Sequence, residues 1–190
     1  MTMLQQSIHT KRLVLRPFVP DDAARLAAIA GLRAISDTMI SVPHPYTRAI
    51  AADAIRRYER ERSRGKGLHF AVSEASNARE LIGYIALRNI DHEHLEGELS
   101  FWIDPQQSGR GFATEAAQTV VDYGFGVLGL NRICGYHMVK NGASKRVLER
   151  LGMVQEGYLR ERVRKRGVFE DVLLWAKVRP KSDLTGSERP

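Results

Sequence analysis

The stretch DPQQSGRGFATEAAQTVVDYGF, residues 104–125, constrains the fold more than any other part of the chain. From residue 112 to about 128, apolar residues recur at spacings of three and four, which predicts an amphipathic helix with one buried face. Gly109 and Gly111 stand just before this helix. Glycines there let an anion reach the unpaired N–H groups of the first turn, where the helix dipole is positive. The sequence therefore predicts a phosphate or pyrophosphate site, to which the Thr114 hydroxyl can contribute. The alternative is a tight loop whose glycines only accommodate positive φ.

Two common phosphate-binding motifs do not fit this loop. A dinucleotide-binding fingerprint requires GxGxxG, but Thr114 stands at the third glycine position. A nucleoside-triphosphate P-loop requires a Lys-Ser/Thr pair after its glycines, and the sequence has none there. The segment before the loop also reads as part of an antiparallel meander, which is the wrong setting for both motifs.

The rest of the chain predicts one α/β domain with a mixed, mostly antiparallel sheet. The expected sheet has about seven strands and is flanked by about four helices. Apolar alternation predicts strands at residues 10–18, 68–74, 81–90, 98–104 and 131–139. Residues 158–178 are expected to form a hairpin that turns at 165–167. Helices are expected from residue 21 or 22, from Thr47 through Arg64, and over 143–151, besides the helix that begins near residue 112. We expect an N-terminal tail at 1–9, the domain at 10–180 and a disordered tail at 181–190.

Composition narrows the class of protein. The 190 residues suit one domain, and hydrophobic and charged contents of 43% and 27% are ordinary for a globular protein. No apolar run reaches the roughly 20 residues that span a bilayer. The N-terminus MTMLQQSIHTKR lacks the apolar core of a signal peptide, so we expect a cytoplasmic protein without a membrane partner. Cys134 is the single cysteine, which excludes an internal disulfide, and we expect no metal site. The net charge of +7 suits a nucleic acid, a membrane surface or an anionic ligand, or is simply a solvated basic surface.

The segment DPQQSGRGFATEA resembles the acetyl-CoA pyrophosphate loop of the GNAT superfamily of N-acetyltransferases. It is most similar to the RimJ/RimL-type branch, which acetylates protein N-termini and related amines. TKRLVLRPF resembles the opening strand of that family, and NGASKRVLERLGMVQEGYLRERVRKRGVFEDVLLWAKV resembles its closing half, with Met153 where phenylalanine is usual. The resemblance covers nearly the whole chain and implies a GNAT fold with acetyl-CoA as co-substrate.

The family's loop pattern, Gln/Arg-x-x-Gly-x-Gly/Ala, fits this sequence in two registers. One begins at Gln106 and matches literally; the other begins at Ser108 and places Ala113 at its last position. We favour the second register because helix entry fixes the geometry of the loop. The resemblance further implies a β-bulge in the strand that contains Ile103, which would free backbone groups there for pantetheine and the acetyl carbonyl. The residues that it implies for cofactor binding are Ile103, Ser108, Gly109, Arg110, Gly111, Phe112, Ala113, Thr114, Asn141, Ser144 and Arg146.

Amine acetylation needs a proton acceptor for the amine and a proton donor for the departing thiolate. Glu98 and Glu156 are the carboxylates that the resemblance places near the cleft. Many GNAT enzymes protonate the thiolate with a tyrosine, but Leu148 stands at that position. Ser144, three residues after Asn141, is the candidate that approaches the sulfur. Each of these residues also has a structural interpretation: the carboxylates as partners of arginines, and Asn141 and Ser144 as helix caps.

The leading hypothesis is an acetyl-CoA-dependent N-acetyltransferase that transfers the acetyl group directly to a primary amine in a ternary complex. The amine belongs to a protein N-terminus, ribosomal or other, or to a small molecule. One alternative is an acyl-CoA-binding regulator without turnover, which the leucine at 148 favours. A basic nucleic-acid binder is the other, although the sequence has no recognisable nucleic-acid motif. A homodimer is left open. The basic cluster RERVRKR, residues 160–166, either attracts CoA phosphates or an acidic substrate, or is a solvated hairpin tip.

Overall fold

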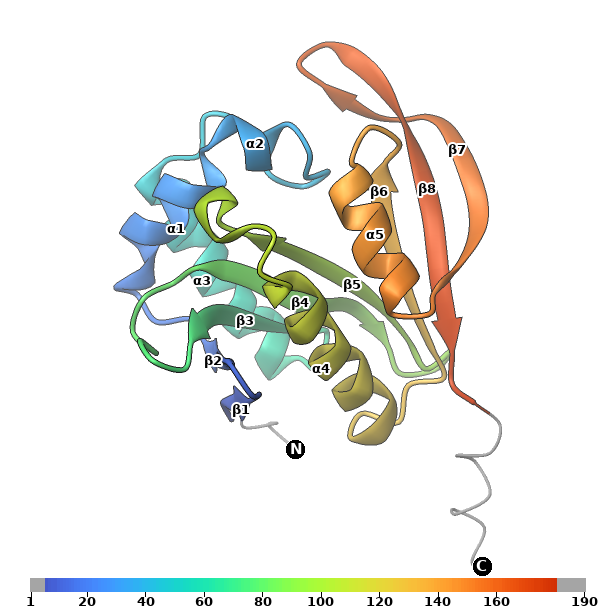
Figure 1. Cartoon of the computed structure of the whole chain (residues 1–190), viewed down its shortest axis with the longest axis horizontal. Coiled ribbons are helices and arrows are strands. Elements are labelled where there is room, and N and C mark those ends of the chain that lie inside the picture. Colours follow the sequence, from blue (N-terminus) through green and yellow to red (C-terminus); the bar gives the residue numbers. More distant parts are fainter. Residues whose placement is uncertain (1–5, 181–190) are drawn as a thin grey trace, which may run out of the picture.

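The computed structural model describes residues 6–180, in which an open, twisted sheet carries helices on both faces (Figure 1). The eight strands lie in the order β1-β2-β3-β4-β5-β6-β8-β7. Neighbouring strands in this part of the chain are antiparallel, except for the parallel pair β5 and β6. The strands are β1 (Ile8–His9), β2 (Leu13–Pro17), β3 (Gly67–Glu74), β4 (Gly83–Asp91), β5 (Glu96–Ile103), β6 (Arg132–Met138), β7 (Val154–Lys165) and β8 (Val168–Val178).

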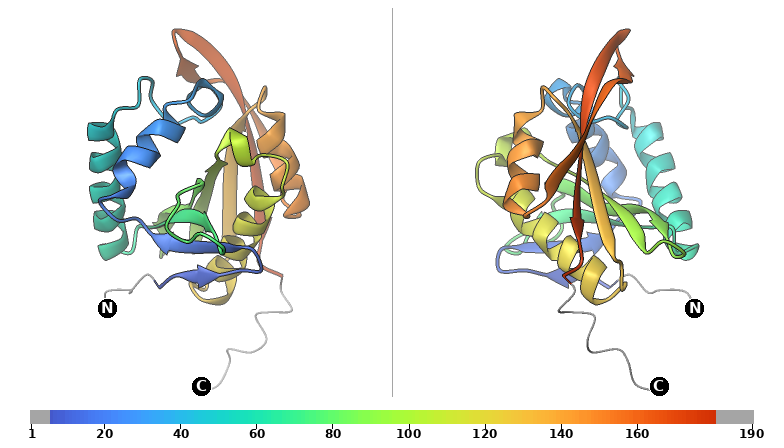
Figure 2. Two further views of the ribbon diagram at one scale, coloured as in Figure 1. Left: turned by 60° about the vertical axis from the view of Figure 1, so that its left-hand side comes forward. Right: turned by 90° about the vertical axis from the view of Figure 1, so that its right-hand side faces the viewer.

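The helices divide between the two faces of the sheet, with α1, α2 and α3 on one side and α4 and α5 on the other (Figure 2). They are α1 (Asp22–Ala30), α2 (Arg33–Ser36), α3 (Arg48–Ser63), α4 (Phe112–Gly126) and α5 (Gly142–Arg150), with a 3-10 turn η1 (Pro105–Gln107) before α4. No helix within residues 6–180 combines the length and the apolar character that crossing a membrane requires.

Two hydrophobic cores sandwich the central strands. On β3, Leu68, Phe70 and Val72 point into the core under α4 and α5, while Ala71 points into the core under α1 and α3. Because both faces are covered, β3 is buried along almost its whole length and reads as a nearly continuous apolar run. The sheet is therefore rigid in the middle, where it supports the loop that leads into α4.

The predicted fold class and most of the predicted elements are confirmed. Thr47 caps α3 by accepting a hydrogen bond from the Ile50 N–H, as expected of a threonine that precedes a helix. The β7–β8 hairpin turns at Arg166 and Gly167, which both have positive φ, 51° and 84°. Two successive residues of positive φ are typical of a turn that follows the right-handed twist of the strands.

The structure differs from the prediction in two elements. The sheet has eight strands rather than about seven, because Ile8–His9 pairs with Val14 and Leu15 of β2, inside the segment predicted to be a tail. The five helices include α2, a single turn that carries no periodic signal of its own. The tail predicted at 181–190 lies outside the described residues.

Strands β5 and β6 pair at one end and diverge at the other. Their register runs from Glu96↔Arg132 to Leu99↔Gly135 and stops there, although β5 continues to Ile103 and β6 to Met138. The β-bulge expected in β5 is not found: its residues from Glu98 to Ile103 pair with β4 in register, and the register shift lies on β4, between Arg88 and Asp91. The gap between β5 and β6 instead arises because each strand follows its other neighbour, β4 or β8.

Candidate active site

The loop between β5 and α4 is anchored by Asp104 and shaped by two glycines. The buried Asp104 carboxylate caps η1 and accepts a hydrogen bond from the Arg25 guanidinium at 2.8 Å. Gly109 has a φ of 81° and Gly111 a φ of 79°, a left-handed conformation that residues with a Cβ rarely adopt. An added Cβ at Gly109 would meet nothing within 4 Å, and one at Gly111 would meet the Arg12 Nη2 at 3.4 Å. Backbone conformation therefore requires both glycines, and the surface that they present is bare main chain.

Helix α4 begins at this bare surface with its first N–H groups unpaired by the helix. Gly111 is the N-cap and has no side chain to act as a cap. Intrahelical bonding begins with the Glu115 N–H, which donates to the Gly111 carbonyl at 3.1 Å. The N–H groups of Phe112, Ala113 and Thr114 lie in the first turn, at the positive end of the helix dipole. The Phe112 side chain is buried in the core, so this residue can offer a ligand only its backbone. The geometry is that of an anion-binding helix terminus.

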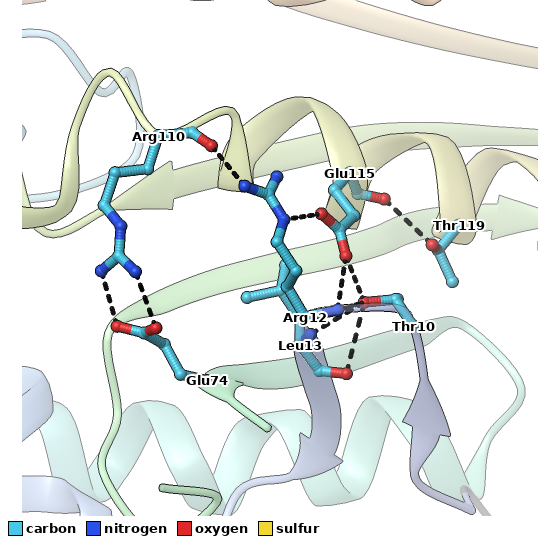
Figure 3. Close-up of polar contacts among 7 residues, drawn as sticks. All are labelled: Thr10, Arg12, Leu13, Glu74, Arg110, Glu115 and Thr119. Carbon is cyan, nitrogen blue, oxygen red and sulfur yellow. Dashed lines mark hydrogen bonds and ion pairs between the residues drawn. The ribbon is translucent and has the colours of Figure 1, made fainter. Parts of the chain in front are cut away.

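Side chains from the turn between β1 and β2 and from the end of β3 hold the loop in place (Figure 3). Arg12 donates to the Glu115 carboxylate at 2.7 Å and to the Arg110 carbonyl at 2.8 Å. The Arg110 guanidinium turns to Glu74, with Nη2 2.9 Å from Oε2, and both arginines lie over the Phe112 ring. Burial raises the pKa of Glu115, but hydrogen bonds from Thr10 and Arg12 outweigh that effect and lower the pKa below its ordinary value. The Arg110 side chain is therefore held by Glu74 and the Phe112 ring, where it fixes the loop.

The gap between β5 and β6 exposes backbone groups of β5 beyond Leu99. The Asp104 N–H donates to the Ile82 carbonyl at 2.8 Å, on the β4 side. Because N–H directions alternate along a strand, the backbone groups of Ile103 and Phe101 point to the opposite side, towards β6. No β6 residue pairs with them, since the ladder ends at Leu99↔Gly135. Ile103 thus offers an unpaired main-chain N–H in the gap, as the sequence resemblance implied.

A cleft joins the loop, the gap and helix α5. A cavity of about 220 Å³ is lined by Ser108 of the loop, by Ala113 of α4, by Ile103, and by Asn141 and Ser144. It continues into a narrower cavity next to β5, since the two share lining residues: Thr38, Met39, Phe101, Asn141 and Ser144. Ser108 and Ala113, rather than Gln106, line the cleft, which is the arrangement that the second loop register requires.

Helix α5 presents Ser144 to both parts of the cleft. The buried Asn141 side chain caps α5 by accepting from the Ser144 N–H at 3.1 Å, and its amide donates to the Thr38 carbonyl at 3.3 Å. The capping role considered from the sequence is therefore present for Asn141. Leu148, one turn further along the helix, lines the narrow part and packs against Gly135. Ser144 is thus the α5 hydroxyl in the cleft, at a place where Leu148 supplies none.

Comparison with known proteins identifies the family. Residues 12–154 match the family described as an acetyltransferase (GNAT) domain, which is more than half of the chain. The chain belongs to the GNAT acetyltransferase family. It is accordingly an acetyl-CoA-dependent N-acetyltransferase, and the bare glycine loop, the free amides of α4 and the gap beside Ile103 form a site that suits a diphosphate followed by an extended acyl carrier.

Relatives match along most of the GNAT chain. The "Probable N-acetyltransferase YjcK" of Bacillus subtilis (strain 168) is 35% identical over 144 residues, 75% of this chain and 79% of the relative. A solved RimL ribosomal L7/L12 alpha-N-protein acetyltransferase in complex with coenzyme A has a TM-score of 0.82 at 16% identity, covering 91% of this chain and 98% of its own. The spermidine N-acetyltransferase from Vibrio cholerae, in complex with CoA and spermine, has a TM-score of 0.77 at 25% identity, with coverage of 89% and 96%.

The two candidate carboxylates of the GNAT site lie in different places. Glu98 lines the narrow part of the cleft together with Ser144 and accepts hydrogen bonds from Arg88 Nε and Asn89 Nδ2, both at 2.9 Å. Glu156 lies on β7 near the paired ends of β5 and β6, where Arg132 binds it. The hydrogen bond from Arg132 lowers the pKa of Glu156.

Of the remaining predicted site residues, some line the cleft and others lie outside it. Neither Glu156 nor Arg146 lines either part of the cleft. Arg146 is exposed on α5, with Nη1 near Gly142. Thr114 is half-buried in the first turn of α4. The structure thus brings Glu98, Ile103, Ser108, Ala113, Asn141 and Ser144 together around the cleft.

Cys134 is unsuited to act as a nucleophile. It is buried on β6, and burial raises the pKa of its thiol to about 12. The thiolate, which is the reactive form, is therefore scarce at neutral pH. Within residues 6–180 no group of three His, Cys, Asp or Glu side chains is placed to hold a metal ion.

Sequence reasoning missed the residues that complete the cleft from the α1–α3 face. Thr38 and Met39 line both parts of it, yet they belong to a segment without periodicity or motif. Tyr136 of β6 lines the narrow part beside Glu98, on a strand whose alternation could have indicated it. Arg25 and Asp104 form an ion pair although they are 79 residues apart in the sequence, and no local sequence pattern predicts this contact.

Proposed function

We propose that this GNAT enzyme transfers the acetyl group of acetyl-CoA directly to a primary amine while both substrates are bound. The observation that carries the proposal is the pair of adjoining cavities, of which one is lined by Ser108 and Ser144 and the other by Ser144 and Glu98. Acetyl-CoA supplies an acetyl group activated as a thioester. The N–H groups of residues 109–114 would hold its diphosphate, and Asn141 and Ile103 would bind along the chain that leads to the sulfur.

Three groups of the protein then perform the transfer. The amine arrives mostly protonated, since ordinary pKa values are about 8 for an α-amino group and about 10 for lysine. Glu98 accepts its proton, directly or through one water, so that the nitrogen lone pair can attack the acetyl carbon. The Ile103 N–H stabilises the negative charge that develops on the acetyl oxygen. As the carbon–sulfur bond breaks, the Ser144 hydroxyl donates a hydrogen bond to the departing thiolate, which takes up the second proton that the nitrogen loses, so that the amide and the free thiol of CoA form.

The acceptor is the primary amine of a protein N-terminus or of a small molecule. Both kinds occur among the proteins that this chain resembles, which include a ribosomal-protein acetyltransferase and a spermidine acetyltransferase. The cleft supports an amine that enters from the α1–α3 face, because Glu98, Tyr136 and the segment around Met39 all line its narrow end. Direct transfer is supported by the buried, protonated state of Cys134, the single cysteine of the chain.

Turnover of the Ser144→Ala variant tests this assignment. With a good amine and thiol-release detection, kcat should fall about tenfold or more, because an oriented proton donor typically contributes that much or more. The affinity for CoA, measured by calorimetry, should change little. Ser63→Ala, an exposed serine at the end of α3, is the control and should keep both values. An unchanged kcat in Ser144→Ala would reduce Ser144 to part of the α5 cap. Acetyl-CoA binding without turnover of any amine would favour a regulator instead.

A further inference from the structure

A second cavity extends from the narrow end of the cleft on the α1–α3 face. We call it the acceptor groove: it measures about 730 Å³, is bounded by α3 and by residues 41–43, and has His69, Tyr84 and Arg88 in its floor. Ser41 and Arg88 line both the acceptor groove and the narrow cavity that holds Glu98. Under the proposed function, an amine that reaches Glu98 therefore leaves the rest of its molecule in the acceptor groove.

The carboxylates along this path already have partners. Glu61 accepts from the His69 Nε2–H at 2.6 Å and lies 3.4 Å from Arg57. The His69 hydrogen bond is the main reason that the pKa of Glu61 is lowered. Glu98 is bound by Arg88 and Asn89, as described above.

Asp53 is the other carboxylate that lines the groove. It lies on the exposed side of α3 and is paired with Arg56. A substrate with several positive charges would have to displace these partners one after another, because no carboxylate of the groove in residues 6–180 is left unpaired.

Among the described residues, the charged side chain of the acceptor groove that has no ion-pair partner is an arginine. Arg60 lines the acceptor groove, and within residues 6–180 no carboxylate lies within ion-pair distance of it. A guanidinium stays charged at any physiological pH, so Arg60 offers a fixed positive charge to whatever fills the groove. A carboxylate is the group that matches it best, through paired N–H···O hydrogen bonds.

The tip of the basic β7–β8 hairpin lies on the same side of the molecule as α2 (Figure 1). The tip is docked by Lys165, which donates to the Val42 carbonyl at 2.7 Å, and by Arg166, which pairs with Asp37 at 2.7 Å. These contacts place the hairpin beside the segment that borders the acceptor groove, whereas the glycine loop is framed by Arg12 and Glu74.

Three further arginines of the hairpin are exposed and, in the described part of the chain, have no ion-pair partner: Arg160, Arg162 and Arg164. Guanidinium groups without a carboxylate partner, on a hairpin whose tip is docked beside the groove, raise the local concentration of acidic ligands and repel cationic ones. Of the two roles open to the RERVRKR cluster, its position favours the acidic acceptor over the CoA phosphates.

We infer that the acceptor is the N-terminal amine of an acidic peptide segment, whose carboxylates pair with Arg60 in the groove and with the arginines of the hairpin that is docked beside it. This inference rests on the proposed function and narrows its substrate class. Polyamines are disfavoured by the same arrangement, since they bring positive charge to a groove in which, among the described residues, the charged side chain without an ion-pair partner is the cation Arg60.

Three peptides of equal length test the inference: one with Asp or Glu at the second to fourth positions, one with Lys there, and one with Ala. The acidic peptide should have a kcat/KM at least about tenfold above the basic one at low salt, and the ratio should shrink as salt screens the charges. Arg60→Glu should lower that ratio by roughly fivefold, and Arg64→Glu, an exposed arginine that does not line the groove, should leave it unchanged.

The peptide assays test acetyl transfer and the preference for an acidic acceptor separately. Turnover of the Ala peptide reports acetyl transfer itself and so tests the proposed function. The acidic-to-basic ratio tests the inference alone. Equal use of the basic peptide or of spermidine would overturn it, as would a ratio that Arg60→Glu leaves unchanged.

Discussion

Replacement of Gly109 by alanine separates the conformational role of the loop from its ligand-binding role. Gly109 has a φ of 81°, and an added Cβ would meet no atom within 4 Å. The cost of Gly109→Ala in the free protein is therefore almost purely the cost of holding alanine in the left-handed region, about 1–2 kcal/mol. For a protein of 150–250 residues, 1 kcal/mol shifts Tm by about 2–4 °C. The free variant should thus melt roughly 2–8 °C below the wild type.

The same substitution should also weaken acetyl-CoA binding, in addition to its effect on the stability of the free protein. The new methyl group projects from the bare surface on which, in our account, the diphosphate lies. Thermal melts with and without a fixed excess of acetyl-CoA measure both effects, because a ligand that binds only the folded state raises Tm by an amount that grows with the logarithm of its affinity. We expect a lower Tm for the free protein and, in addition, a smaller shift on adding the ligand.

Gly126→Ala is the matched control. Gly126 is the last residue of α4, and a Cβ added there also meets nothing within 4 Å, but its φ is not positive. It should keep the wild-type ligand shift and lose no stability, since alanine is the better helix former. If Gly109→Ala melts with the wild type, the strain argument fails. If it melts early but keeps the full ligand shift, the diphosphate does not lie against Gly109.

Three further substitutions test other parts of the structure. Asp104→Asn should lower the free energy of unfolding, measured in urea, by about 1.5–3 kcal/mol, because it removes a charged hydrogen bond to Arg25. Glu80 makes an exposed and longer contact to the same arginine, so Glu80→Gln should lower it by less than about 1 kcal/mol. Equal losses in the two variants would contradict this. Burial lowers the pKa of His69 in the folded state, so the unfolded chain takes up a proton first as the pH falls. The free energy of unfolding should therefore decrease as the pH drops below about 6.5. His69→Gln should flatten that dependence between pH 7 and 5, and an unchanged slope would show that other groups cause it. Cys134→Ala should keep kcat within about twofold, because the raised thiol pKa leaves little thiolate, and loss of turnover would point to an acyl-cysteine route.

Local patterns predicted most of the fold. The spacing of the apolar residues placed α4, and the caps Thr47 and Asn141 marked the starts of α3 and α5, because these signals act over a few residues. Ile8–His9 escaped notice because two residues carry no periodicity and are held by pairing with β2. The single turn α2 escaped for a similar reason, since Ile35 is buried by the core of α1 and α3.

The site was predictable where it depends on backbone and not where it depends on tertiary contacts. Gly109 and Gly111 indicate the loop in the sequence, because glycine is the residue that most readily adopts a positive φ. The Arg110 side chain is bound by Glu74, 36 residues away, and no local pattern indicates that contact. The separation of Glu98 from Glu156 follows from the order of the strands in the sheet, which the sequence leaves open.

The structure of the complex with coenzyme A tests the central claim most directly. We predict that oxygen atoms of the diphosphate lie within about 3.2 Å of backbone nitrogens between residues 109 and 114, as in ordinary N–H···O hydrogen bonds. The thiol end should enter the gap between β5 and β6 next to Ile103 and Ser144. A diphosphate bound elsewhere, or a sulfur outside that gap, would contradict the account.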